Sequence, residues 1–181
     1  MSGMFMSLAQ ITLVEAGIQR IATRMPELSV IESLTVRATT LLGRELSARM
    51  DQWLASSGLS EIEFRALVSL FSRDEGDASP SDLCAALAQS PANMTRVSDA
   101  LVERGLITRL PSEQDRRRTV LRITPAGEQL VRELLPSMAT FTQALFRDFS
   151  AEDKTRLLSD LKRLFAALDG LSQYKPAETA P

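Results

Sequence analysis

The sequence has 181 residues, 23 of them acidic and 21 basic, with no histidine and a single cysteine, Cys84. Without histidine the chain can form no Ser–His or Cys–His catalytic pair and no Cys/His zinc site, so enzymes are disfavoured and we expect no metal and no cofactor. One cysteine forms no intramolecular disulfide, which suits a reducing compartment, and we expect a cytoplasmic protein. The net charge of −2 means that affinity for nucleic acid must come from a local patch.

Residues 1–25 form a moderately apolar N-terminal extension. It has no basic residue before Arg20 and is interrupted by Gln10 and Glu15, so it makes a poor signal peptide and a poor membrane span. We expect a short helix or partial disorder here, and no membrane.

A long helix is expected within residues 26–58, where leucine and methionine recur at four-residue steps until a glycine ends the pattern. These positions are Leu42, Leu46, Met50, Leu54 and Gly58.

Capping signals mark the later helices. Ser60, Ser79 and Ser150 are each followed three residues later by an acid, and proline follows Ser79, Ser90 and Thr124. We expect Pro136 to kink or split the helix in which it lies. The predicted helices lie near 61–72, 80–88, 91–104, 125–148 and 151–170.

The segment 59–124 has the order of a winged helix. Two short helices between 80 and 104 are separated by a tight turn at Gln89 and Ser90, which is helix-turn-helix spacing. Residues 106–110 and 117–123 then bracket a polar turn and predict a hairpin. The expected fold is mainly α with a small β-hairpin wing.

The last two helices carry apolar stripes that a single winged helix cannot cover. They either pack within the chain, or residues 26–58 and 125–173 together form a helical dimerisation region. We expect residues 174–181 to be a disordered tail. The stripes are Leu130, Leu134, Met138, Phe141, Leu145 and Phe149, and then Leu157, Leu161, Leu164, Phe165 and Leu168.

Positive charge is concentrated between residues 90 and 122. This segment holds seven arginines and four acids, a net charge of +3, which leaves −5 for the rest of the chain. The patch therefore coincides with the predicted helix-turn-helix and wing, as in a nucleic-acid binder.

The helix that follows Ser90 would present Ala92, Asn93, Thr95 and Arg96 to base edges in the major groove. Asn93 can pair with adenine, and Arg96 with guanine or a phosphate. Alternatively, the small polar residues near this helix start serve only as caps.

In the wing, Asp115 lies two residues before Arg117 and could aim its guanidinium at the minor groove of A·T-rich DNA. Arg116 and Arg118 would meet phosphates or solvent. Alternatively, Asp115 and Arg117 form a turn-stabilising ion pair worth about 0–1 kcal/mol.

Three runs of residues resemble the MarR family of bacterial transcription regulators. They are T-R-x-x-D-x-L-x-x-R-G-L at 95–106, D-R-R at 115–117, and I-T-P-A-G at 123–127 in place of the usual L-T-x-x-G. The resemblance runs over about residues 34–171 and is greatest to the regulators of Emr-type multidrug efflux operons.

The resemblance implies a homodimer on a palindromic double-stranded operator, held together by its first and last helices. It also implies a repressor that is released from its operator by small aromatic or phenolic acids such as salicylate. By position, the DNA contacts fall on the recognition helix at Ala92, Asn93, Thr95 and Arg96, and on the wing at Asp115 and Arg117. We count Ser90 and Arg116 beside them as further candidate DNA contacts.

Effector residues do not transfer by position, so candidates rest on chemistry alone. An anionic aromatic ligand needs a cation in an apolar cleft, which points to Arg37, Arg44, Met50 and Phe64. The competing interpretation is that these are surface arginines and core apolar residues. We expect Cys84 to be a buried core residue.

The main alternative function is a winged helix that binds protein rather than DNA. An enzyme is disfavoured because no paired-acid arrangement supports one.

Overall fold

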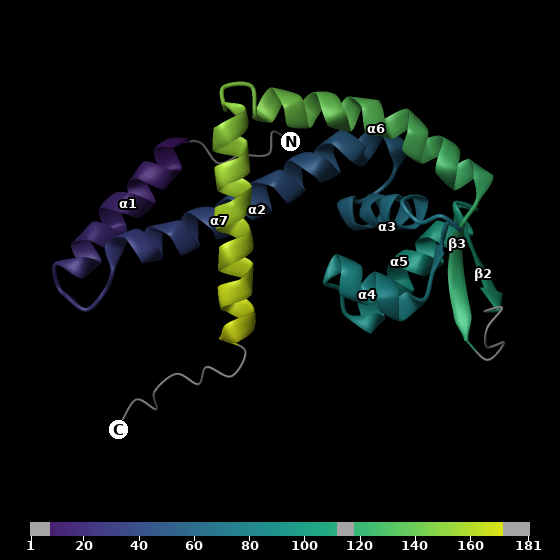
Figure 1. Cartoon of the computed structure of the whole chain (residues 1–181), viewed down its shortest axis with the longest axis horizontal. Coiled ribbons are helices and arrows are strands. Elements are labelled where there is room, and N and C mark those ends of the chain that lie inside the picture. Colours follow the sequence, from purple (N-terminus) through teal and green to yellow (C-terminus); the bar gives the residue numbers. More distant parts are fainter. Residues whose placement is uncertain (1–7, 112–117, 172–181) are drawn as a thin grey trace. The chain divides into compact units, whose positions relative to one another are not determined.

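The computed structural model describes residues 8–111 and 118–171 (Figure 1). The chain divides into two compact units, Met1–Val131 and Arg132–Pro181. The expected tail, residues 174–181, lies outside the described residues.

The first unit begins with a pair of helices. α1 (Leu8–Ala22) packs against α2 (Val30–Leu54), and α2 passes into a 3-10 turn, η1 (Ala55–Ser57). The long helix is confirmed, but the leucines and methionine that indicated it do not share one buried face.

Leu42, one of these leucines, is 56% exposed, whereas its neighbour Leu41 is buried. The reason is geometric. At about 100° per residue, a four-residue step overshoots a full turn by about 40°, so three steps turn the pattern by about a third of a circle.

The winged helix follows α2 along the chain. The predicted helices 61–72, 80–88 and 91–104 are confirmed to within a residue, and so are the capping boxes at Ser60 and Ser79, in which serine and the acid bond each other's backbone N–H groups. Its elements are α3 (Glu61–Phe71), β1 (Asp77–Ala78), α4 (Pro80–Leu87), α5 (Pro91–Glu103), β2 (Ile107–Pro111) and β3 (Thr119–Ile123).

The sheet has one strand more than the hairpin predicted from the sequence. β3 lies in the centre, paired antiparallel with β2 on one side and with β1 on the other. β1 has only two residues, with Asp77 opposite Arg122 and Ala78 opposite Leu121. It is too short to show the alternation of apolar and polar residues by which a strand is recognised in a sequence. The expected class, mainly α with a small antiparallel β wing, is confirmed.

The core of this unit lies between α3, α4, α5 and the sheet. Each of these elements contributes a side chain that is at most 1% exposed, and so do the end of α2 and the start of α6. The recognition helix α5 is therefore held on its inner face by a continuous apolar core. The largest of these side chains are Leu54, Leu67, Leu70, Leu83, Met94, Leu101, Leu121 and Val131.

Two long helices complete the chain: α6 (Pro125–Leu145) and α7 (Ala151–Gly170). Pro136 lies inside α6, which runs on unbroken. Of the two expected outcomes, a kink or a split, the split is therefore wrong. An internal proline removes one backbone hydrogen bond, and on an exposed helix water can satisfy the carbonyl that is left.

α7 begins with the third predicted capping box, at Ser150 and Asp153. The Ser150 side chain and backbone donate hydrogen bonds to the carboxylate, which lowers the pKa of Asp153 below its ordinary value. Several large apolar residues of α7 stay open to solvent: Leu164 is 43% exposed, Phe165 69% and Leu168 63%.

Candidate nucleic-acid interface

The turn between α4 and α5 fixes where the recognition helix begins. Ala88 takes the left-handed conformation at φ 52°, which ends α4, and Ser90 is the N-cap of α5. The Ser90 hydroxyl oxygen accepts the backbone N–H of Asn93 at 3.2 Å. Ser90, a predicted DNA contact, therefore has its side-chain oxygen engaged in capping.

The helix α5 separates a buried face from an exposed one. Met94, Val97, Ser98 and Leu101 are buried in the core. Three of the predicted DNA contacts, Ala92, Thr95 and Arg96, are exposed, and Asn93 is half-buried. The Thr95 hydroxyl donates to the Pro91 carbonyl at 2.9 Å.

A row of hydrogen bonds runs along the exposed side of α5. Arg96 Nη2 donates to Asn93 Oδ1 at 3.0 Å, and Asn93 Nδ2 donates to Gln89 Oε1 at 2.5 Å. Gln89 Nε2 donates in turn to the Leu87 carbonyl at 3.2 Å. The sequence did not assign Gln89 to the site, because Gln89 precedes the N-cap Ser90 and helical spacing does not relate it to Asn93.

The chain's own acceptors hold three of the seven arginines counted in the basic segment. Arg104 donates to the Gly58 carbonyl at 2.7 Å and to the Ser57 carbonyl at 2.8 Å, which ties the end of α5 to the end of α2. Arg109 pairs with Asp99, and Arg122 pairs with Asp77 at 2.6 Å. Three of the seven guanidinium groups are therefore already engaged by the chain, and Asp77, which lies outside the counted segment, offsets one further positive charge.

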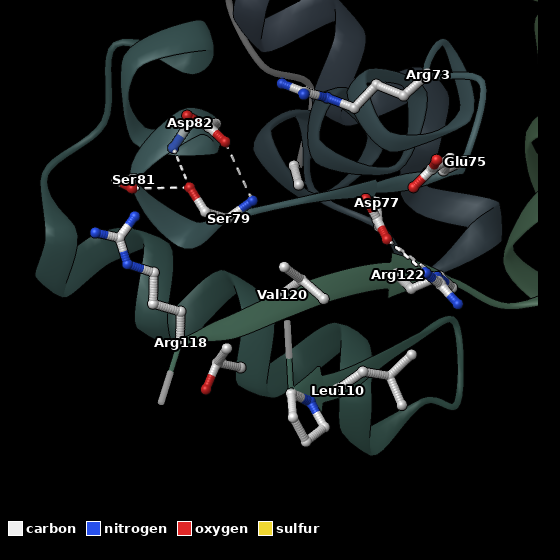
Figure 2. Close-up of a pocket in the computed structure, with 13 residues that line it drawn as sticks. Arg73, Glu75, Asp77, Ser79, Ser81, Asp82, Leu110, Arg118, Val120 and Arg122 are labelled. Atoms are coloured by element: carbon white, nitrogen blue, oxygen red, sulfur yellow. Dashed lines mark hydrogen bonds and ion pairs between the residues drawn. The ribbon is translucent and has the colours of Figure 1, made fainter. Parts of the chain in front are cut away.

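A polar cleft of about 520 Å³ lies beside the wing, between β1, the start of α4 and β3 (Figure 2). Arg118 stands at one end of it and the Asp77–Arg122 pair at the other. Ser79 and Asp82, which cap α4, line it between them. The predicted wing contacts Asp115, Arg116 and Arg117 lie outside the described residues, so their roles stay predictions.

The four effector candidates do not gather around one small ligand within a chain. Phe64 is 3% exposed and packs edge-to-face on Trp53, with ring centroids 5.6 Å apart. Arg37 lines an open groove between α1 and α2. Met50, which is half-buried, lies 13 residues further along α2, a rise of about 20 Å. Arg44 is exposed between them.

Three other expectations concern the rest of the described residues. Cys84 is half-buried, so its placement in the core is wrong: α4 turns Leu83 and Leu87 inward and leaves Cys84 at the edge. Across residues 8–111 and 118–171, no three histidine, cysteine or acidic side chains come together as a metal site. Within the same residues, no helix is both long and apolar enough to cross a membrane.

Comparison with known proteins identifies the family. The MarR family model matches residues 59–119. The transcriptional repressor MprA of Escherichia coli K12 is 31% identical over 162 residues, which cover 90% of this chain and 92% of MprA.

Solved structures agree on the fold. AbsC, a MarR family transcriptional regulator from Streptomyces coelicolor, superposes with a TM-score of 0.72 at 26% identity, covering 79% of this chain and 97% of AbsC. MepR of S. aureus, solved as a DNA complex, has a TM-score of 0.68 at 20% identity, with 73% and 96% coverage. The chain belongs to the MarR family and is a DNA-binding transcriptional regulator, not an enzyme.

Proposed function

We propose that the protein is a homodimeric repressor that binds a palindromic double-stranded operator, with one winged helix, residues 59–124, on each half-site. The observation that carries this proposal is the outward face of α5, where Ala92, Thr95 and Arg96 are exposed on a helix anchored by its core. A helix of this kind fits the major groove, and its first turns meet base edges. A regulator of this kind acts in the cytoplasm, where its DNA lies.

Exposed apolar side chains support the dimer. Leu42 and Val36 of α2 are each more than half exposed, and so are Phe165 and Leu168 of α7. Large apolar side chains left open on each of these helices favour an interface with another chain. Residues 26–58 and 125–173 are the proposed dimerisation region, and residues 1–25 are an N-terminal extension outside it.

The wing completes the DNA contact in this proposal. Asp115 orients Arg117 toward the minor groove, and Arg116 and Arg118 contact phosphates. Arg118, the residue before β3, is exposed, as a phosphate contact requires.

The regulated genes are proposed to be a multidrug efflux operon. Small aromatic or phenolic acids such as salicylate are proposed to release the repressor from its operator. Support for the efflux operon comes from the residues that resemble Emr-type regulators. Support for repression comes from the similarity to the transcriptional repressor MprA over 90% of the chain. Arg37 and Arg44 are the candidate cations for such an anion. They lie about 10 Å apart along α2, so a single-ring acid engages one of them rather than both.

The operator proposal is tested with the DNA upstream of the protein's own gene. The wild type should shift this duplex at a lower concentration than a scrambled duplex of equal length. Arg117→Ala should weaken the shift by about 1–3 kcal/mol while size-exclusion chromatography still gives a dimer. Equal binding of both duplexes, or no binding, contradicts the proposal and favours the winged helix as a protein-binding module.

The effector proposal is tested by titrating salicylate into the protein–operator complex. Salicylate should release the DNA and raise the melting temperature of the free protein, because a ligand selective for the native state stabilises it. Arg37→Gln or Arg44→Gln should raise the salicylate concentration needed. An operator affinity unchanged across a panel of phenolic acids would contradict a ligand-released repressor.

A further inference from the structure

The row formed by Gln89, Asn93 and Arg96 links the turn of the helix-turn-helix to the exposed face of α5. Each bond joins neighbouring turns of chain: Gln89 to Asn93 at four residues and Asn93 to Arg96 at three. The Asn93–Arg96 spacing is one at which side chains meet along a helix. Gln89 precedes the N-cap Ser90, so its bond to Asn93 joins the turn to the first turn of α5.

The row is anchored in backbone that cannot easily move. Gln89 donates to the carbonyl of Leu87, the last residue of α4, whose side chain is 6% exposed. The next residue, Ala88, is held in the left-handed turn. The position of the first bond is thus fixed by the core, and the bonds that follow carry it outward to Arg96.

Arg96 is the member of the row best suited to meet DNA. Its side chain is exposed, and the bond to Asn93 uses one of five guanidinium N–H donors. The others remain for a bidentate contact with the O6 and N7 atoms of guanine. A guanidinium already held in place loses less rotamer freedom on binding than a free one.

Asn93 has a different role from the direct adenine contact expected from its sequence position. Its amide oxygen accepts from Arg96 and its amide nitrogen donates to Gln89. The same two atoms would have to face adenine in a bidentate contact.

We propose that Asn93 and Gln89 are positioning residues that hold the Arg96 guanidinium for a guanine in each half-site. The inference rests on the proposed function, because it requires α5 to enter the major groove. Arg96 reads the base, and Asn93 and Gln89 act through it. Neither contributes a base preference of its own.

The test measures binding to the operator duplex and to a set of duplexes changed at one half-site position at a time. Arg96→Ala should abolish the preference at one guanine. Asn93→Ala should weaken operator binding by about two- to twelve-fold, the cost of ordering one long side chain, and should relax the preference at that same base pair. Gln89→Ala should act at the same position.

The decisive comparison is the double variant. In an Arg96→Ala background, Asn93→Ala should cause no further loss, because the side chain that it positions is gone. Gln19→Ala is the matched control: it removes an exposed glutamine side chain from α1 and should leave the preference unchanged. Thermal melts of all variants should coincide with the wild type.

Different results overturn different claims. If Asn93→Ala relaxes a second base pair, or if its loss adds fully to that of Arg96→Ala, then Asn93 contacts DNA directly and the inference is wrong while the operator proposal stands. If the wild type selects no duplex at all, the proposed function fails and the inference fails with it.

Discussion

Replacing Gly127 with alanine is expected to lower the melting temperature by about 6–12 °C, which corresponds to about 3 kcal/mol for a chain of this size. Gly127 lies in the first turn of α6 and is buried. A Cβ atom there would lie 2.2 Å from the carbonyl oxygen of Leu106 and 2.9 Å from Cγ1 of Ile123.

The clash cannot be relieved by a side-chain rotation, because its closest atom belongs to the backbone. The Thr124 hydroxyl donates to the Gly105 carbonyl at 2.7 Å and accepts the Gly127 N–H at 3.1 Å. The Thr124 N–H also donates to the Leu106 carbonyl at 3.0 Å. Moving α6 away from Leu106 would therefore break the corner that joins β3 to α6.

Gly17→Ala is the matched control, measured by the same thermal melts. In the described residues, a Cβ at Gly17 meets nothing within 4 Å beyond its own helix backbone and immediate neighbours. Because alanine favours a helix over glycine by about 1 kcal/mol, this variant should melt at or above the wild-type temperature. A Gly127→Ala protein that melts with the wild type would show that the corner can shift at little cost.

Gly127 also illustrates what the sequence could and could not predict. Its place in the I-T-P-A-G run marked it as part of a family pattern, but the reason for a glycine there is a contact with Leu106, 21 residues earlier in the chain. The helix starts, in contrast, were predictable because each capping box is complete within three residues.

Long-range polar contacts could not be predicted from the sequence either, because their partners are far apart in the chain. Arg122 finds Asp77 across 45 residues, through a strand, β1, that is too short to have a periodicity. Arg104 finds the Gly58 carbonyl across 46 residues. Every residue has a backbone carbonyl, so the sequence does not show which carbonyl binds an arginine. The charge count therefore treated Arg104 as available to bind DNA.

The candidate site was predictable in outline and not in detail. The exposed positions of α5 follow from helical periodicity around Met94, Val97 and Leu101. Which polar side chain contacts which depends on rotamers, and so the role of Asn93 was not apparent from its position.

These internal pairs alter the expected salt dependence of operator binding. Each phosphate neutralised by a basic side chain contributes about −0.9 to the slope of log affinity against log salt on duplex DNA. The seven arginines between residues 90 and 122 would give fourteen contacts in a dimer and a slope near about −13. With Arg104, Arg109 and Arg122 held by the chain, this segment supplies at most four per protomer.

The dimer is therefore expected to show a slope no steeper than about −7 from this segment. Between 50 and 200 mM salt, the operator affinity should then fall by about 10⁴-fold rather than by about 10⁷-fold or more. Fluorescence anisotropy with a labelled operator, repeated at five or six salt concentrations, measures the slope directly.

Two arginine variants separate the contribution of a proposed phosphate contact to the salt slope from that of an internally paired arginine. Arg116→Ala, which removes a proposed phosphate contact of the wing, should make the slope shallower by about 2 for the dimer, one phosphate for each protomer. Arg109→Ala removes the same charge from a side chain that Asp99 already pairs, so its slope should stay within about one unit of the wild type. Equal changes in the two variants would show that the Arg109–Asp99 pair opens when the protein binds DNA. A wild-type slope of about −13 would show that Arg104, Arg109 and Arg122 all leave their partners in the chain.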